Sequence, residues 1–197
     1  MPTTRRPGGR TARTRAAVLA AVEAELLEHG VDRLTVDAVA ERSGVHRATV
    51  YRRWRDVGGL LADALVAGRE DDWRPGDHGS LTADLVALNR EVVEHLAGPR
   101  PVSRALILAS YRSSAAAAAL RDFLEDRYRR CEVVVERAIE RGEAPAGTDA
   151  RRLLVAATAP IYHEILLMGR GADDALAVRC ATDAARAAGA GVFVGRG

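Results

Sequence analysis

Residues 36–55 read VDAVAERSGVHRATVYRRWR, and this stretch predicts two short helices joined by a tight corner. Val36, Val39 and Ala40 recur at helical spacing, so they share one face of the first helix. Gly44 then interrupts the pattern, and glycine readily adopts the positive φ that such a corner requires. The small side chain of Ala40 would let the two helices cross closely.

The second helix of the corner is predicted to start near Val45 and to have two unlike sides. Val50 and Trp54 are four residues apart, so they share a face that can pack down on the domain. Arg47 and Tyr51 share another face, which presents a cation and a phenol. Such a face suits contacts with phosphates and base edges, and it favours a DNA-binding helix-turn-helix. The alternative is an ordinary αα corner whose arginines are merely solvated.

Charge is distributed unevenly along the 197 residues. Residues 1–55 contain 11 arginines and 6 acidic residues, a net charge of +5, whereas residues 56–197 contain 18 arginines and 21 acidic residues, a net charge of −3. A basic head on a mildly acidic body fits a head that meets a polyanion. The sequence has no long apolar run, and no hydrophobic region follows the basic N-terminus, so we expect a cytoplasmic protein without a membrane partner.

Abundant alanine and scarce β-branched alternation predict an all-α fold. We expect a disordered basic arm, a three-helix DNA-binding head, a connecting helix and a helical ligand-binding and dimerisation bundle. These parts span residues 1–13, 14–55, 56–69 and 80–190. The helices of the bundle are predicted at 81–97, 102–112, 115–141, 149–168 and 173–188, and the remaining tail is expected to be loose. The predicted N-caps include Thr35, Asp56, Ser80, Thr148 and either Asp173 or Asp174.

The helices at 149–168 and 173–188 are apolar over more of their circumference than a one-sided surface helix needs. We expect them to form a four-helix contact with the same helices of a second copy, which would make the chain a homodimer. Pro160 is expected to kink the first of them. The alternative is that both helices lie deep in the core of one chain. Four small residues would permit close approach at the contact: Ala156, Ala157, Ala184 and Ala185.

Polar and aromatic residues within the apolar helices of the body are candidates for a small-molecule pocket, although each could equally be a satisfied core or interface residue. They are Arg104, Tyr111, Tyr128, Tyr162 and His163. We predict no catalytic site, no metal site and no cofactor. The run HEILL at 163–167 lacks the second histidine of a zinc-protease motif, and Cys131 and Cys180 lack the paired spacing of a metal site.

The order of these parts, and above all LTVDAVAERSGVHRATVYRRWRDVGGLLADAL at residues 34–65, strongly resembles the TetR family of bacterial transcriptional regulators. The family's recognition helix closes with an aromatic pair, which here is Tyr51 and Trp54. The resemblance implies that Thr35 and Tyr51 hold phosphates and that Arg52 and Arg53 flank them on the backbone. It also implies that the side chains at the start of the helix lie toward base edges: His46, Arg47, Ala48 and Thr49.

One departure from the family pattern concerns the start of the connecting helix. The family often has a phosphate-binding lysine there, whereas this chain reads Asp56-Val57-Gly58 and has no cation at that place. Either Arg55 replaces it, or the amides at the start of the helix make the phosphate contact.

The expected function is that of a homodimeric repressor that a small-molecule effector releases from a pseudo-palindromic DNA operator. Two recognition helices would enter successive major grooves about 34–36 Å apart. Arg47 is the best candidate for base readout, because a guanidinium can bind guanine O6 and N7 together. Three alternatives stay open: an activator on the same scaffold, a helical ligand-binding protein whose head no longer binds DNA, and a helical enzyme.

Overall fold

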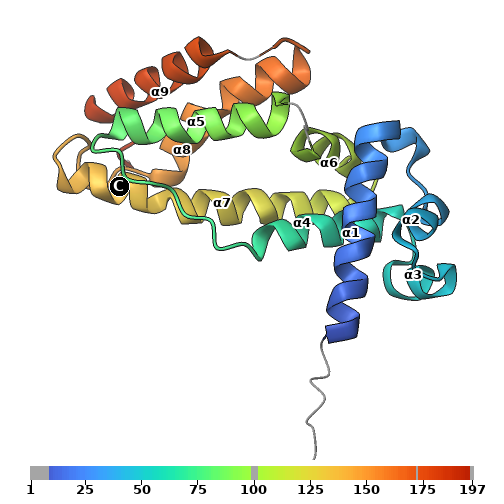
Figure 1. The fold of residues 1–197 in the computed structure, drawn as a ribbon. Coiled ribbons are helices and arrows are strands. Elements are labelled where there is room, and N and C mark those ends of the chain that lie inside the picture. Colours follow the sequence, from blue (N-terminus) through green and yellow to red (C-terminus); the bar gives the residue numbers. More distant parts are fainter. Residues whose placement is uncertain (1–8, 99–101, 172, 196–197) are drawn as a thin grey trace, which may run out of the picture. The chain divides into compact units, whose positions relative to one another are not determined.

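The computed structural model describes residues 9–98, 102–171 and 173–195. Within these ranges its regular structure is helical, apart from one isolated β-bridge, and the all-α prediction is confirmed (Figure 1). The chain forms two compact units. Unit 1 consists of the described residues up to Glu70 together with Ala105–Arg121, and unit 2 consists of Asp71–Arg104 and the residues from Asp122 onward. The segment Ala105–Arg121, which we expected in the body, therefore belongs with the head.

Unit 1 begins with α1, which starts at Gly9 rather than at the predicted Thr14, so part of the predicted disordered arm is helical. Residues 1–8 of that arm lie outside the described residues. Val18 and Val22 are fully buried at a spacing of four residues, which gives α1 the apolar stripe that packs on α2 and α4. The elements are α1 (Gly9–His29), a 3-10 turn (Val31–Arg33), α2 (Val36–Ser43), α3 (Arg47–Trp54) and α4 (Val57–Arg69).

Unit 2 is built on α5 (Leu81–Ala97), which packs against α8 (Ala150–Tyr162) and α9 (Asp174–Gly189). Two helices, α6 (Val102–Ser110) and α7 (Ser114–Glu140), contribute residues to both units. Asn89 is fully buried on α5, and its amide donates to the carbonyls of Ala157 and Ala177 at 3.1 and 3.0 Å. A single polar side chain therefore ties α5 to both neighbouring helices. The core contains Leu81, Leu85, Leu88, Val134, Val135, Leu153, Leu154 and Phe193.

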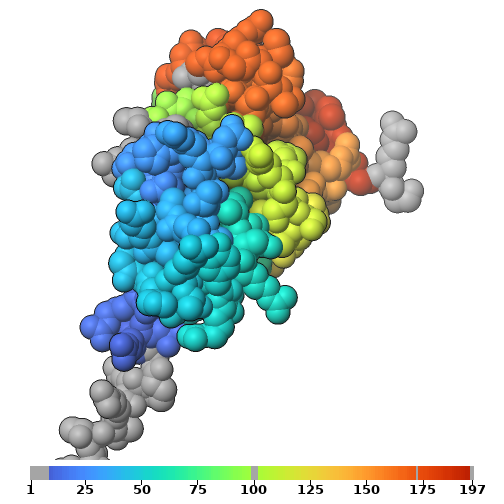
Figure 2. Space-filling view, turned by 90° about the vertical axis from the view of Figure 1, so that its right-hand side faces the viewer, coloured from blue at the N-terminus to red at the C-terminus, as the bar shows by residue number. Residues whose placement is uncertain are grey.

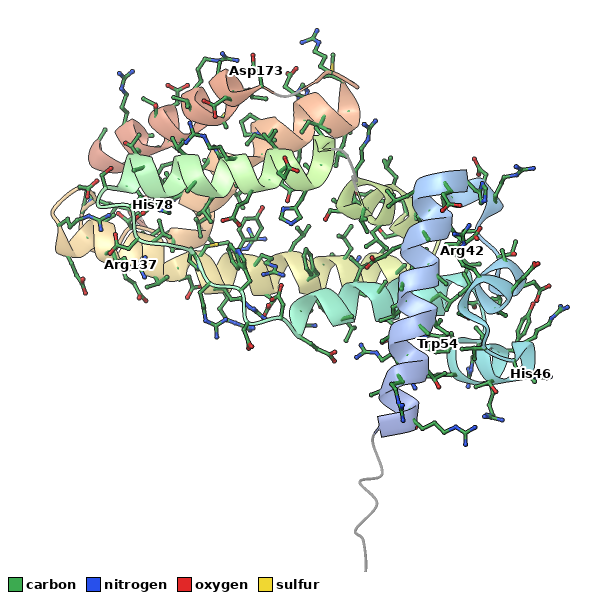
Figure 3. All side chains as sticks on the ribbon, viewed as in Figure 1. Arg42, His46, Trp54, His78, Arg137 and Asp173 are labelled. Atoms are coloured by element: carbon green, nitrogen blue, oxygen red, sulfur yellow. The ribbon has the colours of Figure 1, made fainter. Side chains whose placement is uncertain are left out.

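Two local predictions for unit 2 were wrong, and they concern the N-cap of α8 and the C-terminal tail. The N-cap of α8 is Asp149, which accepts from Arg152 N at 2.9 Å, whereas Thr148 donates to Pro145 O. Pro160 lies inside α8, as predicted, and two residues later α8 ends and the chain continues into a π turn at His163–Leu167. The tail is not loose, because Phe193 is buried and its carbonyl accepts from Asp149 N at 2.9 Å. Asp173 caps α9, as one of the two predicted choices (Figure 3).

Candidate nucleic-acid interface

The corner between α2 and α3 has the local geometry that its sequence predicts. Thr35 caps α2, and its Oγ1 accepts a hydrogen bond from Ala38 N at 3.0 Å. Gly44 ends α2 with a φ of 65°, in the left-handed region. The buried Ala40 lies on the side of α2 that also carries Val39, which is completely inaccessible to solvent.

The two sides of α3 differ as expected. Val50 is 0% exposed and Trp54 is 5% exposed. The candidate contact residues lie on the other side: Arg47, Ala48, Tyr51, Arg52 and Arg53 are exposed and Thr49 is half-buried. In the space-filling view, α2 and α3 form one continuous surface in light blue and cyan (Figure 2). The helix is thus anchored by two residues and presents the others together.

His46 has a role that the sequence reasoning did not include. The helix starts at Arg47 rather than near Val45, and His46 is its N-cap. The ring Nδ1 of His46 accepts from Ala48 N at 3.3 Å, so this ring helps to satisfy the start of the helix. The side chain remains exposed at the outer edge of the corner (Figure 3).

Trp54 is fixed by a polar network that joins three helices of unit 1. Its indole Nε1 donates to Asp63 of α4 at 2.8 Å, and Arg15 of α1 binds the same carboxylate at 2.8 Å. Burial alone would raise the pKa of Asp63, but the hydrogen bonds from Arg15 and Trp54 outweigh it and hold the pKa below its ordinary value. Arg15 also binds Glu70 at 2.6 Å. The inner side of α3 is therefore held by both packing and charge.

The outer side of α3 is organised around Arg47. Its Nε lies 2.6 Å from Oδ1 of Asp37, in the first turn of α2. Its guanidinium carbon lies 5.3 Å from the centre of the Tyr51 ring, one helical turn later. The guanidinium of Arg47 is thus contacted from two sides, by Asp37 of α2 and by Tyr51 of α3.

The junction between α3 and α4 contains the one non-glycine residue with positive φ among the described residues, Arg55, at φ 64°. Asp56 N donates to Trp54 O at 2.7 Å, which closes a γ-turn around Arg55, a strained conformation for an L residue. Asp56 then caps α4, as predicted, by accepting from Gly59 N at 2.9 Å. Gly59 is required here, because a Cβ would lie 2.1 Å from Trp54 O.

Two residues of this region were missed by sequence reasoning. Asp63 lies among apolar residues of α4. The signal that could have identified it is indirect: a buried indole N–H such as that of Trp54 needs a hydrogen-bond acceptor, and Asp63 accepts from both Trp54 and Arg15. Asp37 was missed because nothing in the sequence fixes its distance from Arg47.

Family models match both parts of the chain. The model described as bacterial regulatory proteins of the tetR family matches residues 18–64, and the model described as the tetracyclin repressor-like C-terminal domain matches residues 75–184. The second match alone covers more than half of the chain. This protein belongs to the TetR family. It is therefore a DNA-binding transcriptional regulator, and the family is not one of enzymes.

Individual transcriptional regulators are similar over most of the chain. The HTH-type transcriptional regulator AqdR of Rhodococcus erythropolis is 34% identical over 149 residues, which are 74% of this chain and 71% of that protein. The crystal structure of the TetR family regulator SCO0332 has a TM-score of 0.68 and 29% identity, covering 88% of this chain and 97% of that one. The fold also matches that of FadR from Bacillus subtilis, crystallised with stearoyl-CoA, with a TM-score of 0.63 and 15% identity over 89% of this chain and 98% of that one.

The predicted ligand residues of this TetR-family chain do not form one cluster. Tyr111 belongs to unit 1. Its side chain is 76% exposed, because α6 ends at Ser110 and the predicted helix does not extend to Tyr111. His163 is exposed, since Ile161 and Ile165 occupy the buried side of the helix. Arg104 is half-buried in unit 2.

Tyr128 and Tyr162 are the two predicted ligand residues that lie near each other. The hydroxyl of Tyr128 is 3.4 Å from Thr158 Oγ1. Burial raises the pKa of Tyr162 above its ordinary value, and the neighbouring Tyr128 and Cys131 add to this shift. The sequence had excluded Cys131 only from a metal site, and the structure places it near Tyr162.

Among the described residues, no helix is both long enough and apolar enough to cross a bilayer.

Proposed function

We propose that this TetR-family regulator is a homodimeric repressor that leaves a pseudo-palindromic operator when a small molecule binds unit 2. A protein that binds operator DNA would act where the bacterial chromosome lies, in the cytoplasm. The exposed outer side of α3, with Arg47 held above Tyr51, is the observation that carries the DNA part of the proposal.

The proposed contacts follow from what each side chain can do. Arg47 would read a base, and Tyr51 and Arg52 would bind phosphates. Thr35 uses its oxygen to cap α2, which leaves its hydroxyl proton for a phosphate oxygen. Arg55, exposed at the start of the connecting helix, would supply the cation that the chain lacks at the family's lysine position.

Homodimerisation is proposed to use the exposed stripe of α8 and the π turn. The small residues that we first assigned to the contact are divided: Ala157 and Ala184 are buried within the chain, whereas Ala156 is exposed. Exposed residues nevertheless recur at helical spacing, from Ala156 to Leu167, which is 76% exposed. On α9, Val178 is 36% exposed. A second copy would cover this face.

The proposed effector site is the region around Tyr128, Tyr162 and Cys131 in unit 2, in place of the dispersed five-residue set. The FadR structure with stearoyl-CoA supports ligand binding on this fold, although it says nothing of the ligand of this chain. A tenfold loss of operator affinity needs only about 1.4 kcal/mol of difference in ligand affinity between the two states of the protein.

The DNA part of the proposal is tested by selecting bound duplexes from a random pool with the full-length chain. We expect an inverted repeat whose half-sites are about one helical turn apart or a little more. The Arg47→Ala variant should lose specific binding, while Arg121→Ala, which removes an exposed arginine of α7, should retain it. An unenriched pool, or an Arg47→Ala variant with full affinity for the selected site, would reject the assignment of α3.

Dimerisation is tested by light scattering of two matched variants. Leu167→Glu should give a monomer, whereas Leu108→Glu, at a leucine that is 44% exposed in unit 1, should leave the dimer intact. A wild-type chain that is monomeric at micromolar concentration would refute this part of the proposal. A reporter placed behind the selected site gives the regulatory sign, because deleting a repressor gene raises transcription and deleting an activator gene lowers it.

A further inference from the structure

Asp37 is an acidic residue on the surface that is proposed to meet a polyanion. It is the second residue of α2, two positions after the N-cap Thr35, and its side chain is 47% exposed. A carboxylate in this place is repelled by phosphates, so it weakens the general attraction between the head and DNA. Its presence therefore calls for a role other than affinity.

Asp37 forms an ion pair with Arg47 whose closest atoms are one carboxylate oxygen and Nε. Oδ1 of Asp37 lies 2.6 Å from Nε, and the guanidinium lies 5.3 Å above the Tyr51 ring. The side chain of Arg47 is 64% exposed, and ion pairs this open to solvent contribute little to folding stability. The pair is better suited to orienting the guanidinium, which otherwise samples many rotamers on a long flexible chain.

The geometry leaves the correct groups available for a base. The closest approach of Asp37 to Arg47 is at Nε, and the two terminal nitrogens of Arg47 carry four further N–H donors. Guanine presents two acceptors, O6 and N7, in the major groove, and a guanidinium binds both at once. Adenine presents a donor in place of one acceptor, so an arginine held in this orientation discriminates between the two purines.

We propose that Asp37 is a specificity-determining residue: it holds Arg47 near Nε so that the two terminal nitrogens can donate to O6 and N7 of one guanine. This inference rests on the proposed DNA-binding function of α3. It assigns Asp37 two effects of opposite sign, since the carboxylate lowers affinity for DNA in general and raises the preference for guanine at one position of each half-site.

The test measures affinity for the selected operator and for the same operator with that guanine pair changed to adenine–thymine. A bidentate arginine–guanine contact discriminates by roughly tenfold to a hundredfold. We expect Asp37→Ala to lower this preference by roughly fivefold while raising the affinity for unrelated DNA. In an Arg47→Ala background, Asp37→Ala should leave the preference unchanged, because the side chain that it orients is absent.

Asp32→Ala is the matched control, since Asp32 is an acid of the same unit that is 82% exposed and pairs with Arg112. It makes the same change of charge and should not alter the guanine preference. If thermal melting shows that Asp37→Ala does not fold, Asp37→Asn replaces it, and its preference should also fall.

The two possible failures are distinguishable. If Arg47→Ala abolishes the guanine preference while the folded Asp37 variant retains it, the role of Asp37 is refuted and the proposed function stands. If Arg47→Ala itself retains the preference, the assignment of Arg47 to base readout fails.

Discussion

Replacing Asp63 should destabilise unit 1 by an amount that its contacts allow us to estimate. The carboxylate accepts from Trp54 Nε1 at 2.8 Å and from two nitrogens of Arg15 at 2.8 to 3.2 Å. Hydrogen bonds to charged groups contribute about 1.5–3 kcal/mol each to stability. Because the side chain of Asp63 is 21% exposed, solvent reduces the contribution of its hydrogen bonds below that range. We expect Asp63→Ala to lower the free energy of unfolding by about 2–3 kcal/mol. Asp63→Asn, which keeps an acceptor for Trp54, should lower it by about half as much.

The measurement is urea unfolding followed by the fluorescence of Trp54. The chain has two tryptophans, so a Trp73→Phe background leaves Trp54 as the reporter of unit 1. With an m-value of about 2 kcal/mol/M, Asp63→Ala should move the midpoint down by about 1 M. Asp32→Ala, which removes an exposed ion-pair partner, should move it by less than about a quarter of that. Equal shifts for the two variants would show that the Asp63 network does not stabilise the head.

The pH dependence of the same variants has a defined sign. In the folded protein the pKa of Asp63 lies below its ordinary value. The carboxylate therefore stabilises the fold fully at any pH above the pKa that it has in the unfolded chain, about 4. This contribution is lost as the pH falls through the folded pKa. The difference in stability between the wild type and Asp63→Asn should therefore narrow as the pH is lowered from about 6 to about 3. A difference that stays constant over this range would contradict the lowered pKa.

Three further predictions concern single positions. Arg55→Gly should stabilise the protein by about 0.5 kcal/mol, because it relieves the positive φ, and should reduce the salt dependence of DNA binding; an unchanged urea midpoint would argue against strain at this residue. Gly59→Ala should cost more than about 2 kcal/mol in the same assay, because the added Cβ would meet Trp54 O. Burial raises the pKa of the Cys131 thiol to about 12, with nearby Glu91 adding to it, so iodoacetamide at pH 8 should modify it only after unfolding, as mass spectrometry can show.

The parts of the fold that depend on neighbours in the sequence were predictable. Thr35, Asp56 and Ser80 cap helices through backbone groups three residues away, so their role can be inferred from the local order of residues. The same holds for the division of α3, since Val50 and Trp54 lie on one side of any helix that contains both.

The parts that depend on distant neighbours were not predictable in the same way. Tyr111 was predicted to lie in a helix at 102–112 and to line a pocket, and this inference fails because α6 ends at Ser110 and leaves Tyr111 exposed. Phe193 follows the last helix and looks like part of a loose tail, yet it fills the core of unit 2. The partners of Asp63 lie nine and 48 residues away along the chain, and no periodic pattern connects them.

Close packing at Gly58 has a consequence for anyone who wishes to recombine TetR-family parts. A Cβ on Gly58 would lie 2.1 Å from the hydroxyl oxygen of Ser113, so the start of α4 packs against a residue 55 positions later in the chain. The head is therefore a discontinuous module. A fragment cut after Glu70 would leave this surface of α4 uncovered. A chimera with the body of a relative would need three crossovers, after Glu70, Arg104 and Arg121, so that Ala105–Arg121 stays with the head to which it belongs.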